Sequence, residues 1–269
     1  MERVGRLAAD LTGALGRRFL ARLGESLDQV ALLWRVIVTL VRARGRGRQI
    51  IRTTTIEQIY FTGIQALPVL GAVALLLGVL VIVESTERLS AVGLEEALGR
   101  VMVVMIIREL GPVMTALLVI LRSGVAIGIK LGYMTALREM ESIEMQGVDP
   151  LHLVAIPRII GLMTAIVCLF IYFDVVAVFG GAAFAWAVWG IPLGRLSWVV
   201  SRAISFPDVA IGLVKAIFFG GVIGIIFVYR GMSAGRKLTA VAPQVSRAAV
   251  ECLLWCLVLD VTISAFFYL

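Results

Sequence analysis

Charged residues are scarce in this chain of 269 residues, making up 16% of it, whereas 60% of the residues are hydrophobic. Soluble globular domains average about 25% charged and about 45–50% apolar residues. The mean hydropathy of +1.00 and the long uncharged runs exclude a soluble enzyme, a disordered tail or a DNA-binding module as the main interpretation. The net charge of +7 therefore indicates contact with an anionic cytoplasmic leaflet rather than with nucleic acid.

Side chains suited to catalysis or metal binding are also few. His152 is the only histidine, and the three cysteines lie in apolar runs, where they act as small fillers: Cys168, Cys252 and Cys256. No metal-ligand cluster or nucleophile–base pair can be assembled from them. The glycine-rich stretch Gly124–Lys130 lacks the spacing of an ATP-binding loop. We therefore expect no catalytic activity and no cofactor in this chain, and any ATP hydrolysis must come from another chain.

Five apolar segments are long enough for transmembrane helices, which need about 20 residues. They lie at about 59–83, 101–121, 159–179, 209–229 and 248–269. The apolar stretch 159–194 exceeds one span, and we expect Asp174 and the Gly180-Gly181 pair to divide it into a span and an extracytoplasmic helical piece. The predicted fold class is all-α integral membrane, with a five-span domain at 49–269.

The basic residues predict the orientation of these spans. Nineteen Lys and Arg lie in the segment up to Arg52, the 122–158 connection and the 230–247 connection, against four in the opposite loops. Because cytoplasmic loops carry the excess of basic residues, the N-terminus is predicted inside and the C-terminus outside. Leucines at helical spacing between arginines predict an interfacial amphipathic helix over 1–48, with a soluble helix packed on a partner as the alternative.

The connection after the second span predicts a short amphipathic helix at 134–145. Gly147 and Pro150 follow as stop signals. One face is apolar and rich in methionine, the other is charged; the helix comprises Met134, Leu137, Arg138, Glu139, Met140, Glu141, Ile143, Glu144 and Met145. Methionine adapts to a partner groove, and the acidic face would be repelled by an anionic leaflet. We therefore favour docking on a protein partner over a helix resting on lipid.

Several motifs in this region resemble the permease subunit of the MlaE/YrbE family, which belongs to ABC transporters that work with MCE-domain proteins. The matching positions are Arg108–Pro112, Val148-Asp149-Pro150, Pro157-Arg158, Lys215 and Leu259-Asp260. The family's Glu-Gln pair reads Glu139-Met140 here. The resemblance extends from about residue 50 onward.

This resemblance implies a homodimeric core in a bacterial inner membrane. A cytoplasmic ATPase dimer, which binds the ATP and Mg²⁺, would dock on the 134–145 helix, and this arrangement would be compatible with a small accessory subunit on the ATPase. A ring of MCE-domain protein would sit on the periplasmic face. The cargo would be phospholipid or a related lipid moved between the inner and outer membranes. The alternatives are a lipid-modifying membrane enzyme and a membrane scaffold.

Four charges fall inside the predicted spans: Arg108, Glu109, Lys215 and Asp260. At about 1.5 Å rise per residue they lie about 10–14 Å from the outer ends of their helices, so they share one layer. Charges at such depth need pairing or water. We expect Lys215 to pair with Asp260, and Arg108 or Glu109 to face a lipid-binding cavity with Leu77, Leu80 and Val81. The alternative is that all four charges simply link helices.

Glycines recur at four-residue spacing in two places, Gly124/Gly128/Gly132 and Gly220/Gly224. Such spacing allows helices to approach closely. We favour ordinary packing between helices over a dimer seam.

Overall fold

The computed structural model describes residues 48–90, 103–190 and 206–268, together with isolated positions at 24, 28–29, 31–32, 34–35, 194 and 204. The chain divides into two compact units, Met1–Arg46 and Gly47–Leu269. The predicted interfacial helix at 1–48 lies almost wholly outside the described residues and stays a prediction.

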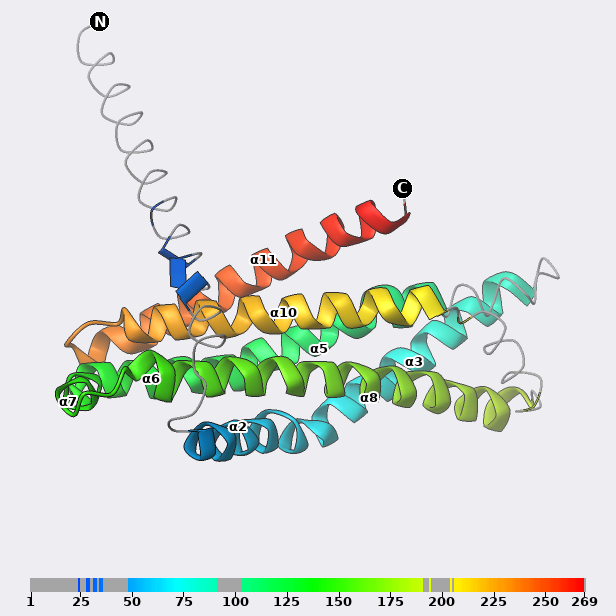
Figure 1. The fold of residues 1–269 in the computed structure, drawn as a ribbon. Helices are drawn as coiled ribbons and strands as arrows, with labels where there is room; N and C mark the ends of the chain where they lie inside the picture. The colour runs from blue at the N-terminus through cyan, green and yellow to red at the C-terminus, as the bar shows by residue number, and fades with distance from the viewer. Residues whose placement is uncertain are drawn as a thin grey trace, which may run out of the picture. The chain divides into compact units, whose positions relative to one another are not determined.

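In the described part of the second unit every regular element is helical. Five stretches are long and apolar enough to cross a membrane: Ile51–Glu84, Val104–Ala136, Leu151–Val188, Phe206–Met232 and Leu238–Phe267. The predicted all-α class with five spans is therefore confirmed. The long helices run beside one another (Figure 1).

The first span begins earlier than predicted and is interrupted once. Helix α2 (Arg48–Thr62) leads through a 3₁₀ turn, η1 (Ile64–Ala66), into α3 (Leu67–Ser90). Pro68 stands in the first turn of α3, a position where its missing N–H costs nothing because the group would be unpaired anyway. The break therefore lies just before the proline rather than within a kinked helix.

The second span is longer than predicted and contains two π-helical segments. It runs through η2 (Val103–Leu110), α5 (Gly111–Val119), η3 (Ile120–Gly124) and α6 (Val125–Ala136). The prediction ended this span at Leu121 because Arg122 follows. In the structure Arg122 donates to Gln65 Oε1 at 3.0 Å and stacks over the Phe61 ring, so a neighbouring helix accommodates the charge and the span continues.

The predicted helix at 134–145 is divided in the structure. Met134 belongs to α6, and the chain turns at Leu137 and Arg138, whose φ of 61° is left-handed. Helix α7 (Glu139–Met145) follows and ends before Gly147, whose φ is 76°. The predicted start was five residues too early, because the helix formers before the break extend the second span instead.

The third span is one unbroken helix and corrects the prediction of a divided segment. It follows a short π-helical turn, η4 (Leu151–Ala155), whose Leu151 N–H is accepted by Asp149 Oδ1 at 2.9 Å. Helix α8 (Ile156–Trp189) then passes straight through Gly180-Gly181. These glycines serve packing: a Cβ on Gly181 would lie 2.8 Å from the Gly78 carbonyl oxygen of α3.

The last two spans form a hairpin. Helix α10 (Phe206–Met232) is joined by a short loop and η5 (Leu238–Ala240) to α11 (Val241–Tyr268). Near the loop Arg230 donates through Nε and Nη2 to Glu251 Oε2 at 2.9 and 2.8 Å. This ion pair holds the two helices together where they meet the polar end of the bundle.

The core lies where α8 packs against α3 and α10. Fully buried aromatic side chains fill it: Phe170 and Phe173 of α8, and Phe219 and Phe227 of α10. The recurring glycines face other helices of the same chain, since a Cβ on Gly124 would meet the Phe227 ring and one on Gly220 would meet Met163 of α8. This confirms ordinary packing between helices as the use of these two stripes.

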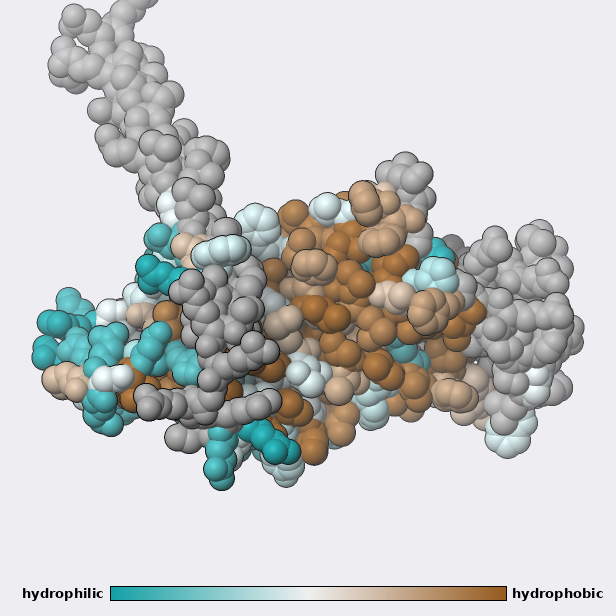
Figure 2. Space-filling model, in the orientation of Figure 1, coloured by the Kyte–Doolittle hydropathy of each residue, from teal (hydrophilic) through white to brown (hydrophobic). Residues whose placement is uncertain are grey.

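Hydrophobic residues cover the middle of the visible face, and hydrophilic residues gather at the end that carries α7 (Figure 2). The loop between α10 and α11 lies at the same end, where Arg236 Nη2 is 3.4 Å from Glu141 Oε1 of α7. The two connections that the sequence assigns to one side of the membrane are therefore neighbours in the fold.

Candidate functional site: a charge cluster inside the spans

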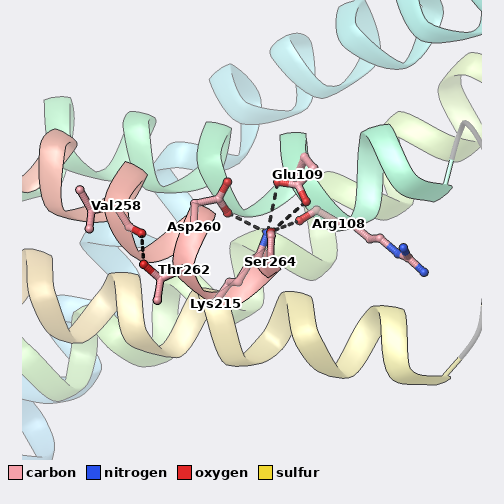
Figure 3. A network of polar contacts seen from close by, with 7 residues as sticks. All are labelled: Arg108, Glu109, Lys215, Val258, Asp260, Thr262 and Ser264. Carbon is pink, nitrogen blue, oxygen red and sulfur yellow. Dashed lines mark hydrogen bonds and ion pairs between the residues drawn. The ribbon is translucent and has the colours of Figure 1, made fainter. Parts of the chain in front are cut away.

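Lys215 of α10 is the centre of a buried polar cluster. Its side chain has 0% exposure, and Phe219 lies one turn further along the same buried face. The ammonium donates to the Arg108 carbonyl oxygen at 2.9 Å and lies 3.3 Å from Glu109 Oε2 and 2.8 Å from Asp260 Oδ1 (Figure 3). The ammonium therefore hydrogen-bonds the first two oxygens and forms an ion pair with the third.

The local sequence helps the backbone carbonyl of Arg108 to accept from Lys215. In an α-helix its donor would be the N–H of residue 112, which is Pro112 and has none. The π-helical segment η2 ends at Leu110, directly before Gly111-Pro112. The Arg-Glu-Leu-Gly-Pro motif therefore places a backbone carbonyl and a carboxylate beside each other, and both accept from one lysine.

Glu109 connects η2 to α11 as well as to α10. Its Oε1 accepts a hydrogen bond from Ser264 Oγ at 3.1 Å, while Oε2 faces Lys215. Its side chain is 41% exposed, unlike that of Lys215. Glu109 is therefore the member of the cluster that a ligand entering from outside the bundle can reach.

Arg108 is directed away from the lysine. Its Nε donates to Asp208 Oδ1 at 2.8 Å, its Nη2 also contacts that oxygen, and Figure 3 shows the guanidinium extending away from Glu109. Asp208 lies in the first turn of α10 and is almost fully buried. Arg108 thus joins η2 to the start of α10, while the neighbouring Glu109 joins it to α11.

A further carboxyl group lies on the other side of η2. Asp174 of α8 approaches Gly111 so closely that a Cβ there would be 2.4 Å from Asp174 Oδ1. That oxygen is buried and has no hydrogen-bond partner among the described residues. Gly111 is therefore required for the close approach of α8 to the second span.

The structure brings together three of the four charges that the sequence placed in one layer, Glu109, Lys215 and Asp260, while the Arg108 guanidinium turns to Asp208. Arg108 and Glu109 meet α10 and α11 through Asp208, Lys215 and Asp260. Sequence reasoning missed Asp208, Ser264 and Asp174 as members of the site. Asp208 precedes Lys215 by seven residues and Ser264 follows Asp260 by four, spacings that place each pair on one helix face, and this signal was available.

The apolar candidates of the first span are exposed to different degrees. Leu80 of α3 is exposed and Leu77 is half-buried, whereas Val81 is buried in the core. Leu80 and Leu77 can contact a lipid in the isolated chain. Val81 is enclosed by neighbouring helices and supports the packing of α3.

Helix α7 exposes its acidic side chains and buries part of its methionine face. Glu139, Glu141 and Glu144 are exposed, and Met140 is buried against the rest of the chain. Leu137, Arg138 and Met145 are exposed, whereas Met134 and Ile143 are half-buried. A partner that reaches α7 therefore meets carboxylates and Met145 rather than a continuous methionine stripe.

Comparison with known proteins places this chain in a family. The sequence model of the family described as Permease MlaE matches residues 55–266. The intermembrane phospholipid transport system permease protein MlaE of Haemophilus influenzae is 27% identical over 253 residues, which cover 89% of this chain and 97% of that protein.

Two further relatives extend this similarity. A probable ABC transporter permease protein of Rickettsia bellii is 25% identical over 96% of this chain and 98% of its own length. The chloroplastic protein Trigalactosyldiacylglycerol 1 of Arabidopsis thaliana is 26% identical over 80% of this chain and 61% of its own length. The family match covers three of the five apolar helices wholly and the other two almost entirely, and it includes the whole charge cluster; on this basis the chain belongs to the MlaE permease family.

Proposed function

We propose that the chain is the permease subunit of an ABC transporter that moves phospholipid or a related lipid between the inner and outer membranes of a bacterium. The family match and the name of the Haemophilus influenzae relative, an intermembrane phospholipid transport system permease, support this proposal. The observation that carries it is the partly exposed Glu109 carboxylate in a buried intramembrane cluster, since charged groups inside spans usually mark a transport pathway.

The proposed arrangement has the α7 end in the cytoplasm and the C-terminus in the periplasm. The excess of basic residues in the connections at that end supports it. We further propose a homodimer in the inner membrane. Apolar side chains of α11 such as Leu254, Val258 and Val261 are exposed in the single chain, which leaves a surface for a second copy or for lipid.

The proposed partners occupy opposite ends of this dimer. A cytoplasmic ATPase dimer, which binds the ATP and Mg²⁺, docks on α7 through the exposed Glu139 and Glu144. A ring of MCE-domain protein lies on the periplasmic face, and a small accessory subunit on the ATPase is compatible with this arrangement. The carboxylates of α7 favour a basic ATPase surface, because opposite potentials steer partners together.

In the proposed lipid site Glu109 meets the polar head group, and Leu77 and Leu80 contact the acyl chains. Arg108 is held by Asp208, so Glu109 is the better candidate for direct contact. Its function would be to bind hydrogen-bond donors of the head group or glycerol region in the layer where hydrocarbon gives way to polar groups.

The test is transfer of labelled phospholipid by the complete complex in proteoliposomes. Glu109→Gln should leave assembly intact and lower the transfer rate about tenfold, since a hydrogen bond to a charged group contributes about 1.5–3 kcal/mol. Glu57→Gln, at an exposed position of α2, is the matched control. Normal transfer by Glu109→Gln would exclude the proposed lipid contact.

Co-purification separates this proposal from the two alternatives. A permease subunit should bring an ATPase with it, whereas a lipid-modifying enzyme or a scaffold should not. Mass spectrometry of lipids in the purified assembly would then identify the cargo class.

A further inference from the structure

The cluster around Lys215 contains more negative than positive charge. Lys215 supplies one positive charge, and Glu109 and Asp260 supply one negative charge each when ionised. Arg108 does not correct the balance, because its guanidinium is turned away and bound to Asp208. Among the described residues the other titratable groups around the cluster are Asp174 of α8, facing Gly111, and Cys256 of α11, near Asp260, and neither adds a positive charge.

An excess charge is unfavourable at this place. The lysine is fully buried, and in surroundings of low polarity two carboxyl groups that share one site do not both ionise. The single ammonium of Lys215 is shared between the two carboxyl groups, with Nζ 3.3 Å from Glu109 Oε2 and 2.8 Å from Asp260 Oδ1. One negative charge of the cluster therefore remains without a matching cation within the described part of the chain.

The geometry around Asp260 shows independently that its Oδ1 lacks a well-placed hydrogen-bond donor among the described residues. Its Oδ1 is buried and forms no hydrogen bond of good geometry, although Lys215 Nζ is only 2.8 Å away. Asp260 and Glu109 face the same ammonium, through Oδ1 and Oε2 respectively. An ionised carboxylate can only accept hydrogen bonds, whereas a protonated one also donates. A proton on one of these two carboxyl groups supplies the missing hydrogen-bond donor and at the same time removes the excess negative charge.

We propose that Glu109 and Asp260 together bind one exchangeable proton beside Lys215, which makes the cluster a proton-binding site inside the spans. The occupied site is neutral, with one ammonium, one carboxylate and one carboxylic acid. Glu109 is the route of exchange because it is 41% exposed while the lysine is enclosed. Release of the proton leaves a net negative charge between η2, α10 and α11 and weakens the contacts that hold these three elements together.

This inference does not depend on lipid being the cargo, and its test does not use transport. The measurement is infrared spectroscopy of the purified chain in lipid nanodiscs at neutral pH, where the C=O stretch of a protonated carboxyl group is separate from the carboxylate bands and shifts in D₂O. The wild-type chain should show this band. Glu109→Gln and Asp260→Asn should each remove the cluster's contribution, because the remaining carboxylate is then balanced by Lys215.

Two control variants show which carboxyl groups give rise to the C=O band. Asp174→Asn removes the other buried carboxyl group, and Glu57→Gln removes an exposed one. In both variants the part of the C=O band that comes from the cluster should remain. Glu109→Gln replaces a half-exposed side chain by one of the same shape, so it provides the result if Asp260→Asn does not fold. A band that survives in Glu109→Gln, or that disappears only in Asp174→Asn, would overturn the proposal.

Discussion

Lys215 joins three elements through one ammonium group. It contacts the backbone of η2, a carboxylate of η2 and a carboxylate of α11 from its position on α10. Removing one member of a buried ion pair is strongly destabilising, because the partner is left charged and unpaired. The stability of the outer half of the bundle should therefore respond to this residue more than to any exposed charge.

Lys215→Met should lower the free energy of unfolding by about 3–5 kcal/mol, since it removes the only ammonium that faces Glu109 Oε2, Asp260 Oδ1 and the Arg108 carbonyl in the described part of the chain. Asp260→Leu should cost less, because Glu109 still faces the lysine. The double variant should lose less than the sum of the two, with a coupling of about 0.5–3 kcal/mol. Thermal unfolding in detergent, followed by Trp fluorescence, measures all three variants. Additive losses would contradict the pair.

At the scale of elements, glycines decide which helices touch. Gly180 and Gly181 look like a helix break in the sequence, but α8 runs through them and uses Gly181 to approach α3. The periodicity of an apolar run does not show whether a glycine ends a helix or admits a neighbour. That distinction depends on what lies opposite, which the tertiary structure supplies.

Gly78→Ala should destabilise the chain by about 1–3 kcal/mol through overpacking. The added Cβ would lie 2.1 Å from the Ala177 carbonyl oxygen, a backbone atom that cannot move without shifting α8. Gly221→Ala is the matched control in α10, because its Cβ would meet only Met163 Cε at 3.9 Å. Thermal unfolding of both variants should separate them; equal midpoints would show that α3 and α8 can move apart freely.

Helix α7 is the other element with a specific prediction. Glu139→Lys or Glu144→Lys should release the ATPase in a pull-down, since each reverses an exposed charge on the proposed docking surface. Membrane insertion should be unchanged because neither residue lies in a span. Glu57→Lys controls for the change in net charge. ATPase that is retained by both α7 variants would place the contact elsewhere.

At the scale of the whole molecule, the α7 loop and the first turn of α10 are expected on opposite sides of the membrane. In a Cys168→Ala background, where the remaining Cys252 and Cys256 are buried, Gln146→Cys should react with an impermeant maleimide only in inside-out vesicles. Phe206→Cys, at the highly exposed start of α10, should react only in right-side-out cells. The reverse pattern would invert the proposed topology.

The sequence by itself determined the membrane class, the number of spans and the layer in which the charges lie. These follow from local composition, because a run of about 20 apolar residues must cross the bilayer and helical rise converts residue number into depth. It also identified candidate functional residues, because Arg108, Glu109, Lys215 and Asp260 stand out as charged residues in apolar runs.

Only the tertiary structure decided how these charges are partnered and where helices end. Arg108 and Glu109 are neighbours in sequence, yet one contacts the start of α10 and the other contacts Lys215 and Ser264. The rotation of each helix about its axis sets this division, and local composition does not express it. The second span likewise continues past Arg122 because residues of another helix receive its charge. Depth is a property of one segment, whereas pairing depends on the direction in which several helices face each other.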